Sequence, residues 1–181
     1  FVEENGLAVD TLINNAGVGF NGRFGDSHPA QNEATIRLNT LAPVTLTRLL
    51  LPALRRGGRA HVLNVASLAA FFPMPWLPVY SSSKSFVLAF SLALREELRG
   101  AGVSVSVVCP NGIRTNRAAR ELIATQGLAG RLTCQYPEQV ARAALRGMEA
   151  GKAVIVPGVV NRFIRFASGL VPRSLAMGVI T

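Results

Sequence analysis

Four side chains in the sequence have the types and spacing needed to move a proton to or from a carbonyl or alcohol oxygen. Tyr80 and Lys84 are four positions apart in a segment of helical periodicity, so their side chains are neighbours on one helix face. A phenol has a pKa of about 10, and a nearby ammonium group favours the phenolate and lowers that pKa. The pair can therefore act in general acid–base catalysis. Ser67 can hydrogen-bond the same oxygen, and Asn39 can hold a water molecule near Lys84.

Each of these residues also has an ordinary structural explanation. A lone Tyr80 is typical of an amphipathic helix, a lone Lys84 of a solvated helix face, and Asn39 can simply bridge backbone groups. Their combination with Ser67 at this spacing favours a catalytic site. The remaining hydroxyl and imidazole groups nearby are predicted to be packing, surface or structural residues, namely Ser81, Ser82, Ser83, Ser85, His28 and His61.

Short segments rich in β-branched residues alternate with segments of helical periodicity along the chain. Strands are predicted at 9–16, 60–65, 103–108 and 153–156. Helices are predicted at 29–51, 79–99 and 137–149, with a loop and a helix between 111 and 132. Such alternation indicates parallel βαβ units, and hence a single α/β domain built on a doubly wound, Rossmann-like parallel sheet.

Ligands of an open parallel sheet bind beyond the carboxyl ends of its strands. The first predicted strand ends in NNAG at 14–17, Ser67 follows the second strand, and PNGIRT at 110–115 follows the third. Tyr80 and Lys84 open the helix between the second and third strands, so we expect one site at this end of the sheet. The segment between Ser67 and Tyr80 is apolar, which suggests the wall of an apolar substrate pocket made by Phe71, Phe72, Met74, Trp76 and Leu77.

At these motifs the sequence resembles the short-chain dehydrogenase/reductase family. NNAG, Asn39 in RLNT, Ser67 in NVAS, YSSSK at 80–84 and PNGIRT occur in the order and spacing of that family, and YPEQVA at 136–141 resembles its final helix. The resemblance implies an oxidoreductase that interconverts a carbonyl and an alcohol by hydride transfer, with a catalytic tetrad of Asn39, Ser67, Tyr80 and Lys84. In reduction, Tyr80 would donate the proton, Ser67 would polarise the carbonyl, and Lys84 with Asn39 would resupply the proton.

The same resemblance implies NAD or NADP as the cofactor. Lys84, beside Tyr80, would bind the nicotinamide ribose. Asn15, Ala16 and Gly17 would line the adenosine side of the cofactor. Ile113 and Thr115 would meet the nicotinamide carboxamide and the phosphates.

Two features depart from the family pattern. Asn111 follows Pro110 where the family usually has glycine, and asparagine tolerates the turn conformation that is needed there. The glycine-rich phosphate loop of the family precedes NNAG by two βαβ units, or roughly 60–80 residues. We therefore expect the chain to be the C-terminal, catalytic part of an N-terminally truncated fold that is inactive alone and binds NAD(P)H negligibly.

A second glycine pattern needs a separate interpretation. Gly17, Gly19 and Gly22 match G-x-G-x-x-G, the dinucleotide fingerprint. The fingerprint needs a helix directly after it, and the residues from Gly22 to Asp26 do not read as a helix start. We interpret this match as chance.

Composition excludes several classes of protein. Of 181 residues, 49% are hydrophobic and 16% charged, an ordinary globular balance, and the net charge of +9 is spread along the chain rather than gathered in a nucleic-acid-binding patch. No apolar run reaches the roughly 18 residues of a membrane span, and no signal peptide is visible. Cys109 and Cys134 lack metal-ligand spacing, so we expect reduced thiols and a cytoplasmic protein without a metal.

Partners are predicted from two regions. The helices at 29–51 and 79–99 are apolar around much of their circumference, and in the resembling family they pair between subunits, so we expect a homodimer or homotetramer. Residues 151–181 read as a basic apolar tail, with no acidic residue after Glu149. A helix packed on the domain or at a subunit interface is favoured there, and membrane-surface association is the alternative. A non-catalytic binding or regulatory protein on the same scaffold also stays open.

Overall fold

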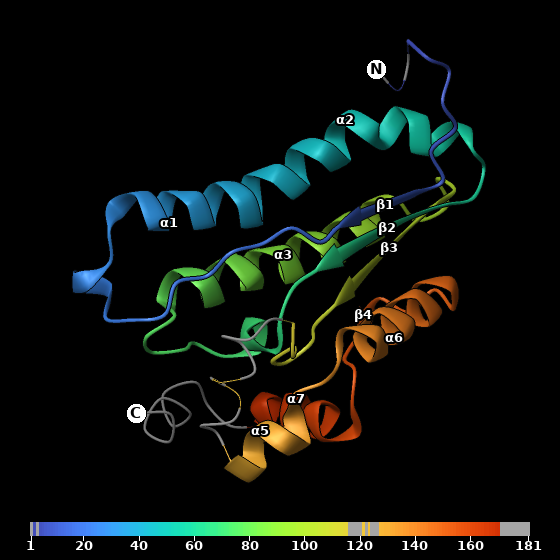
Figure 1. Ribbon diagram of the computed structural model, residues 1–181. Coiled ribbons are helices and arrows are strands. Elements are labelled where there is room, and N and C mark those ends of the chain that lie inside the picture. The colour runs from blue at the N-terminus through green and yellow to red at the C-terminus, as the bar shows by residue number, and fades with distance from the viewer. Residues whose placement is uncertain (1, 3, 116–120, 122, 124–126, 171–181) are drawn as a thin grey trace.

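The computed structural model describes residues 2, 4–115, 121, 123 and 127–170, and these form a twisted parallel sheet flanked by helices (Figure 1). The sheet has the order β1-β2-β3-β4, and every neighbouring pair is parallel. The strands are β1 (Thr11–Asn14), β2 (Ala60–Val65), β3 (Val103–Val108) and β4 (Val154–Ile155). All four lie within the predicted segments, and the bounds of β2 and β3 are those predicted. The carboxyl ends of the strands therefore meet at one edge of the sheet.

One long helical segment connects β1 to β2, where a single helix was predicted. It consists of α1 (Pro29–Ile36), a π-helical turn η2 (Arg37–Leu41) and α2 (Ala42–Arg56). The segment begins at a capping box formed by His28 and Gln31. The π-helical turn, which the sequence did not predict, is closed by the Ala42 amide that donates to the Arg37 carbonyl. Such turns are frequent at functional sites, and this one contains Asn39.

Helix α3 (Pro78–Glu97) connects β2 to β3, close to the predicted helix. Pro78 occupies the first turn, where its missing N–H leaves no hydrogen bond unmade. After the helix, Gly100 and Gly102 adopt positive φ angles and turn the chain into β3.

The remaining helices lie after β3 or are short. They are α5 (Gly127–Thr133), α6 (Pro137–Glu149), α7 (Val159–Leu170) and the 3-10 turns η1 (Phe24–Asp26) and η3 (Leu68–Phe71). Most of 116–126, where part of a helix was expected, lies outside the described residues. The expected tail from 151 contains β4 and α7 in its described part. No helix of the described residues is both long and apolar enough to cross a membrane.

Helices cover both faces of the sheet, which confirms the doubly wound α/β fold. On one face Leu54 of α2 and Leu98 beyond α3 pack with Val62 and Val105 of the sheet. On the other face Val108 joins a cluster with Leu63 of β2 and with Ala144 and Met148 of α6. Successive side chains of a strand point to opposite faces, so the buried run VSVSVV in β3 serves both layers.

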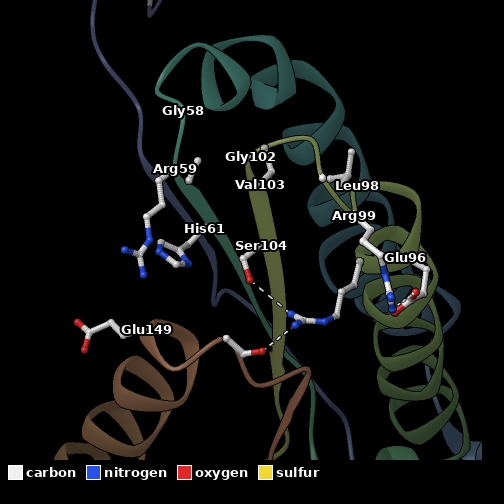
Figure 2. Close-up of a pocket in the computed structure, with 14 residues that line it drawn as sticks. Gly58, Arg59, His61, Glu96, Leu98, Arg99, Gly102, Val103, Ser104 and Glu149 are labelled. Atoms are coloured by element: carbon white, nitrogen blue, oxygen red, sulfur yellow. Dashed lines mark hydrogen bonds and ion pairs between the residues drawn. The ribbon is translucent and has the colours of Figure 1, made fainter.

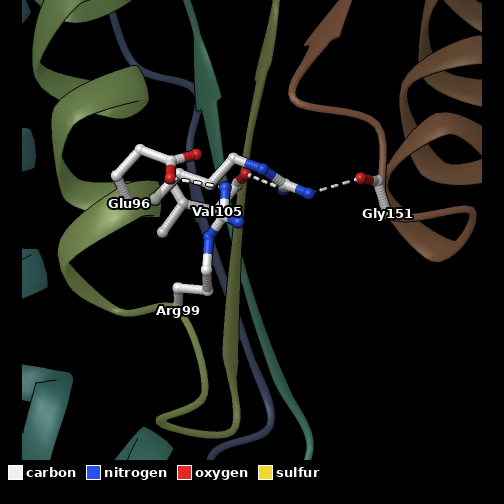
Figure 3. Close-up of polar contacts among 5 residues, drawn as sticks. Glu96, Arg99, Val105 and Gly151 are labelled. Carbon is white, nitrogen blue, oxygen red and sulfur yellow. Dashed lines mark hydrogen bonds and ion pairs between the residues drawn. The ribbon is translucent and has the colours of Figure 1, made fainter.

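One arginine links α3 to β3 and to the turn before β4. Arg95 of α3 donates hydrogen bonds to the Val105 carbonyl at 2.6 Å and to the Gly151 carbonyl at 2.7 Å, which link α3, β3 and the turn before β4 (Figure 3). Around it lies an open cleft of about 630 Å³ that Arg59, His61 and Glu149 also line (Figure 2). This cleft is at the opposite end of the sheet from the predicted site.

Candidate active site

Tyr80, Ser67 and Lys84 meet at the carboxyl ends of the strands, as their spacing predicts. Ser67 is the N-cap of the 3-10 turn η3 after β2, and its side chain hydrogen-bonds the Tyr80 phenol. Lys84 lies one turn along α3, and its Nζ is 5.8 Å from the centroid of the Tyr80 ring. The same Nζ donates to the Val65 carbonyl at the end of β2, at 2.9 Å. The lysine is buried, and this hydrogen bond fixes its ammonium group behind the phenol.

The pKa of Tyr80 corrects one expectation from the sequence. A neighbouring ammonium was expected to lower it, yet burial raises the pKa of Tyr80 above its usual 10.0, and the hydrogen bond with Ser67 only partly opposes that effect. The Lys84 ammonium lies over the ring and donates to Val65, not to the phenol oxygen. Tyr80 is therefore protonated at neutral pH and is suited to donate a proton.

Burial also perturbs the two groups behind Tyr80. It lowers the pKa of Lys84 from 10.5 to about 8, partly opposed by the nearby Cys109. It raises the pKa of the Cys109 thiol to about 12. Cys109 and Cys134 are both buried and free. A lysine with a pKa near 8 can exchange a proton close to physiological pH.

Asn39 joins the loop after β1 to helix α3. Its Oδ1 accepts from the Val18 amide at 3.0 Å, and its Nδ2 donates to the Val18 carbonyl at 2.8 Å and to Ser83 Oγ at 2.9 Å. The residue is 2% exposed. These contacts match the backbone-bridging role weighed from the sequence, and the water-holding role stays a prediction.

Ser83 is a residue whose role was missed. It was predicted to be a packing or surface residue, but its hydroxyl links Asn39 to the Tyr80 carbonyl, to which it donates at 2.7 Å. The signal was present, because positions 80, 83 and 84 lie on one face of a helix.

Two glycines of the loop after β1 lie directly against the polar cluster. A Cβ on Gly17 would lie 3.0 Å from Lys84 Nζ and 3.1 Å from Asn39 Oδ1. A Cβ on Gly19 would lie 2.5 Å from Tyr80 Cδ2, closer than real contacts allow. The glycine pattern therefore reflects close approach to Lys84 and Tyr80. Only the short 3-10 turn η1 follows Gly22, and the next α-helix begins at Pro29, so the pattern does not lead directly into an α-helix, in agreement with the chance interpretation.

The residues expected to line the cofactor lie at the same edge of the sheet. Asn15, Ala16 and Gly17 are exposed after β1. Ile113 forms a parallel bridge with Gln135, and the Thr115 amide donates to the Ile113 carbonyl at 2.8 Å. The Leu68 amide donates to the Pro110 carbonyl at 2.7 Å, so the loops that carry Ser67 and Ile113 are tied together.

The residues expected to form an apolar pocket wall differ in their burial. Phe71 and Phe72 pack against a buried cluster, whereas Trp76 is 50% exposed. Trp76 adopts φ +67, which is rare for a large residue, and its carbonyl accepts from the Gly22 amide at 2.8 Å. The Arg23 guanidinium lies 5.5 Å from its ring centroid. These contacts join the loops after β1 and β2 at the mouth of the site.

Comparison with known proteins bears on this arrangement. The family model described as short chain dehydrogenase matches residues 1–125. The chain belongs to the short-chain dehydrogenase family. Among curated members of this family, the ketoacyl reductase HetN of Nostoc is 37% identical over 142 residues, which are 78% of this chain and 48% of that protein. The dehydrogenase/reductase SDR family member 7B of Xenopus laevis is 32% identical over 170 residues, or 91% of this chain and 53% of that protein.

The chain thus spans about half the length of the curated short-chain dehydrogenases it matches. Solved structures agree in fold. A 7beta-hydroxysteroid dehydrogenase structure superposes with a TM-score of 0.80 at 23% identity, over 92% of this chain and 64% of that one. A 3-ketoacyl-(acyl-carrier-protein) reductase from Brucella melitensis, complexed with NADH, superposes with a TM-score of 0.70 at 27% identity, over 87% and 68%.

Proposed function

We propose that this chain forms the catalytic part of an NAD- or NADP-dependent oxidoreductase that interconverts a carbonyl and an alcohol. The observation that carries the proposal is the convergence of the Tyr80 phenol, hydrogen-bonded to Ser67, with the Lys84 ammonium 5.8 Å from its ring. A merely structural tyrosine needs neither a buried lysine behind it nor a serine at its hydroxyl. The related proteins named as reductases and dehydrogenases support the same reaction class.

In the proposed reduction, the substrate carbonyl oxygen lies between the Ser67 hydroxyl and the Tyr80 phenol. Ser67 donates a hydrogen bond that polarises the carbonyl, and the protonated Tyr80 transfers its proton to that oxygen as the alcohol forms. Lys84 then stabilises the phenolate and returns a proton to it, which its lowered pKa of about 8 permits. Asn39 holds the loop after β1 in place and completes the proposed route for proton resupply.

The residues at the sheet edge fit a dinucleotide. Asn15, Ala16 and Gly17 are exposed after β1, and Gly17 lies beside Lys84, where a Cβ would be 3.0 Å from the ammonium nitrogen. Lys84 has three N–H donors, and within the described residues Val65 accepts one of them, so donors are left for a ribose hydroxyl. We assign Tyr80 and Lys84 to the ribose, and Ile113 and Thr115 to the nicotinamide and phosphate side. When bound, NADH or NADPH would supply the hydride for reduction, and NAD or NADP would accept it in the reverse oxidation.

The proposed substrate class rests on exposed apolar side chains near Tyr80. Trp76, Phe20 and Phe24 are 50%, 41% and 64% exposed. Phe20 and Phe24 line one pocket with Pro78 and Val79, the two residues that precede Tyr80 in the sequence. We therefore propose an apolar carbonyl or alcohol substrate.

Exposed apolar residues on the two long connecting helices support the proposed homodimer or homotetramer. Leu41 of η2 is 54% exposed and Leu49 of α2 is 67% exposed, and Phe86 on α3 is 46% exposed. Apolar patches of this kind mark interfaces. Light scattering of the intact protein should give a dimer or tetramer at micromolar concentration, and a monomer would contradict this assembly.

The deciding experiment measures NADH- and NADPH-dependent reduction of apolar ketones by the intact protein and by its Tyr80→Phe variant. Loss of the general acid should lower turnover by about 10²–10⁴-fold. Cofactor binding should weaken much less, because Lys84 keeps its proposed contact with the ribose. Tyr136→Phe is the matched control, because Tyr136 is the other of the two tyrosines and is 53% exposed. A loss of less than about tenfold in Tyr80→Phe would reject Tyr80 as the proton donor. Absence of turnover in the wild type with both cofactors would favour the non-catalytic alternative.

A further inference from the structure

Helix α7 exposes an apolar stripe along its whole length. Val159, Phe163, Phe166 and Leu170 recur at helical spacing, and they are 72%, 70%, 67% and 70% exposed. The opposite side of the helix faces the domain, where Asn161 is buried and Ile164 packs against a core cluster. The sequence favoured a helix packed on the domain or at a subunit interface. Helix α7 does pack on the domain, but by the side opposite the apolar stripe.

A cationic groove lies against the same helix. It has a volume of about 310 Å³ between α6, the edge strand β4 and α7, and it is lined by Arg146, Lys152, Arg162 and Arg165. No acidic residue lines this groove among the described residues. All four cations are exposed, and the Arg165 guanidinium also lies over the Phe71 ring, 5.2 Å from its centroid.

We propose that the apolar stripe of α7 and the adjoining cationic groove form a docking surface for an anionic membrane. Phospholipid headgroups would occupy the groove, and the two phenylalanines would enter the boundary between headgroups and acyl chains. A helix with one apolar face and flanking basic residues lies in the membrane interface in this way. Basic side chains near an anionic leaflet add an attraction that salt weakens.

Charge decides between a membrane and a second copy of the chain as the occupant. In a symmetric dimer the same patch faces itself, so Arg162 and Lys152 of one copy would approach the same cations of the other. Residues after Glu149 contain no Asp or Glu that can offset this repulsion. An anionic lipid surface covers the stripe and also complements the charge of the groove. A second copy could cover the stripe but would place like charges against the groove.

The test is co-sedimentation of the intact protein with vesicles. We expect binding to vesicles that contain phosphatidylglycerol, weaker binding as salt is raised, and little binding to pure phosphatidylcholine. Phe166→Ser should reduce binding to the vesicles by about tenfold or more, because the variant lacks the apolar side chain that would move from water into the membrane. Phe24→Ser is its matched control, since Phe24 is similarly exposed, at 64%, but lies in the 3-10 turn η1 and not in α7.

The contribution of the groove is tested by a second pair of variants. Lys152→Gln with Arg162→Gln should weaken binding by about tenfold or more, while Arg55→Gln with Arg59→Gln removes the same net charge elsewhere and should change it little. Equal binding to both vesicle types, or unchanged binding in Phe166→Ser, would overturn the proposal. A third outcome would also overturn the proposal: the protein binds no vesicles, and Phe166→Ser dissociates its oligomer. The stripe would then join copies of the chain. Ketone reduction by Phe166→Ser should match the wild type.

Discussion

The layer between the sheet and helices α2 and α3 differs in kind at its two ends. At the amino ends of the strands it is apolar, and Leu54 and Val105 there are completely buried. At the carboxyl ends the same layer is polar. Asn64 accepts from Asn14 at 2.7 Å and donates to Ser91 at 2.8 Å.

We infer that the apolar end mainly stabilises the fold and that the polar end mainly positions the residues of the candidate active site. Burial of apolar surface stabilises a fold in proportion to its area, whereas a buried amide must be hydrogen-bonded merely to offset the loss of water. The polar end therefore adds little net stability, but its directional bonds fix Asn39, Ser83 and Lys84 in one geometry. We expect substitutions at the apolar end to lower the free energy of unfolding, and substitutions at the polar end to lower turnover.

The largest expected effect is on the apolar side. Leu54→Ala leaves a cavity in a fully buried cluster and should lower the free energy of unfolding by about 2–5 kcal/mol. Leu132→Ala, at a position that is 67% exposed on α5, should change it by less than about 0.5 kcal/mol. Urea unfolding compares them. Tyr80→Phe should unfold like the wild type, and a loss as large as that of Leu54→Ala would remove the distinction between the two ends.

The next effect concerns the arginine at the amino ends. Arg95→Met removes hydrogen bonds to the Val105 and Gly151 carbonyls and should lower the free energy of unfolding by about 1.5–3 kcal/mol. Arg99→Met is its control four residues on, because the Arg99 side chain is 77% exposed and pairs with Glu96 on the surface. Such pairs contribute less than about 1 kcal/mol. Equal losses in the two variants would show that Arg95 does not join these elements.

A third prediction tests the polar end by geometry alone. Gly19→Ala places a methyl group 2.5 Å from the Tyr80 ring and must displace it. A misplacement of about 1 Å can lower turnover by up to about 10²-fold, so we expect a loss of tenfold or more with little change in unfolding. Gly25→Ala in the same loop meets no atom within 4 Å and should be neutral in steady-state kinetics of the intact protein. Full activity in Gly19→Ala would contradict this prediction, because it would mean that the loop after β1 moves to accommodate the methyl group while the Tyr80 ring stays in place.

The smallest effect is the dependence of stability on pH. Since burial lowers the pKa of Lys84 to about 8, the folded lysine loses its proton between pH 8 and 9 while the unfolded one keeps it. The unfolded chain then binds more protons, so the free energy of unfolding rises with pH in this window. The gain from pH 7 to 9, relative to Lys84→Met, should be about 1 kcal/mol.

Above pH 9 the Cys109 thiol opposes this gain. Its pKa is raised to about 12, so it stays protonated in the fold after the unfolded thiol has ionised. The raised pKa of Tyr80 acts in the same direction above pH 10. Urea unfolding at several pH values, with Lys84→Met alongside, isolates the contribution of Lys84. A wild type that loses stability relative to the variant between pH 7 and 9 would contradict a lowered pKa.

Much of the fold was predictable because its signals are local. The β-branched runs at β2 and β3 and the glycines after α3 define elements by short-range pattern, and the bounds of β2, β3 and α6 agree with those predicted. Tyr80 and Lys84 were predictable as neighbours because one helical turn separates them. Ser67 could be placed with them because it follows the neighbouring strand.

What the sequence did not reveal depends on contacts between distant segments. The π-helical turn at Asn39 forms where that side chain meets Val18, and no local pattern encodes this meeting. The pKa of Tyr80 depends on how much of the ring is buried, which charge spacing alone cannot tell. The role of Gly19 became visible only once the Tyr80 ring was seen against it.

The joined loops at the mouth of the site also give the chain an optical probe of its own. Trp76 is the single tryptophan of the sequence, so the intrinsic emission of the chain comes from one known place. Its indole is half exposed and stacked under the Arg23 guanidinium, an arrangement that a molecule entering the mouth must disturb. Indole emission shifts in wavelength and intensity with the polarity around the ring. Ligand arrival can therefore be followed by fluorescence in the unmodified protein, without a label and without turnover.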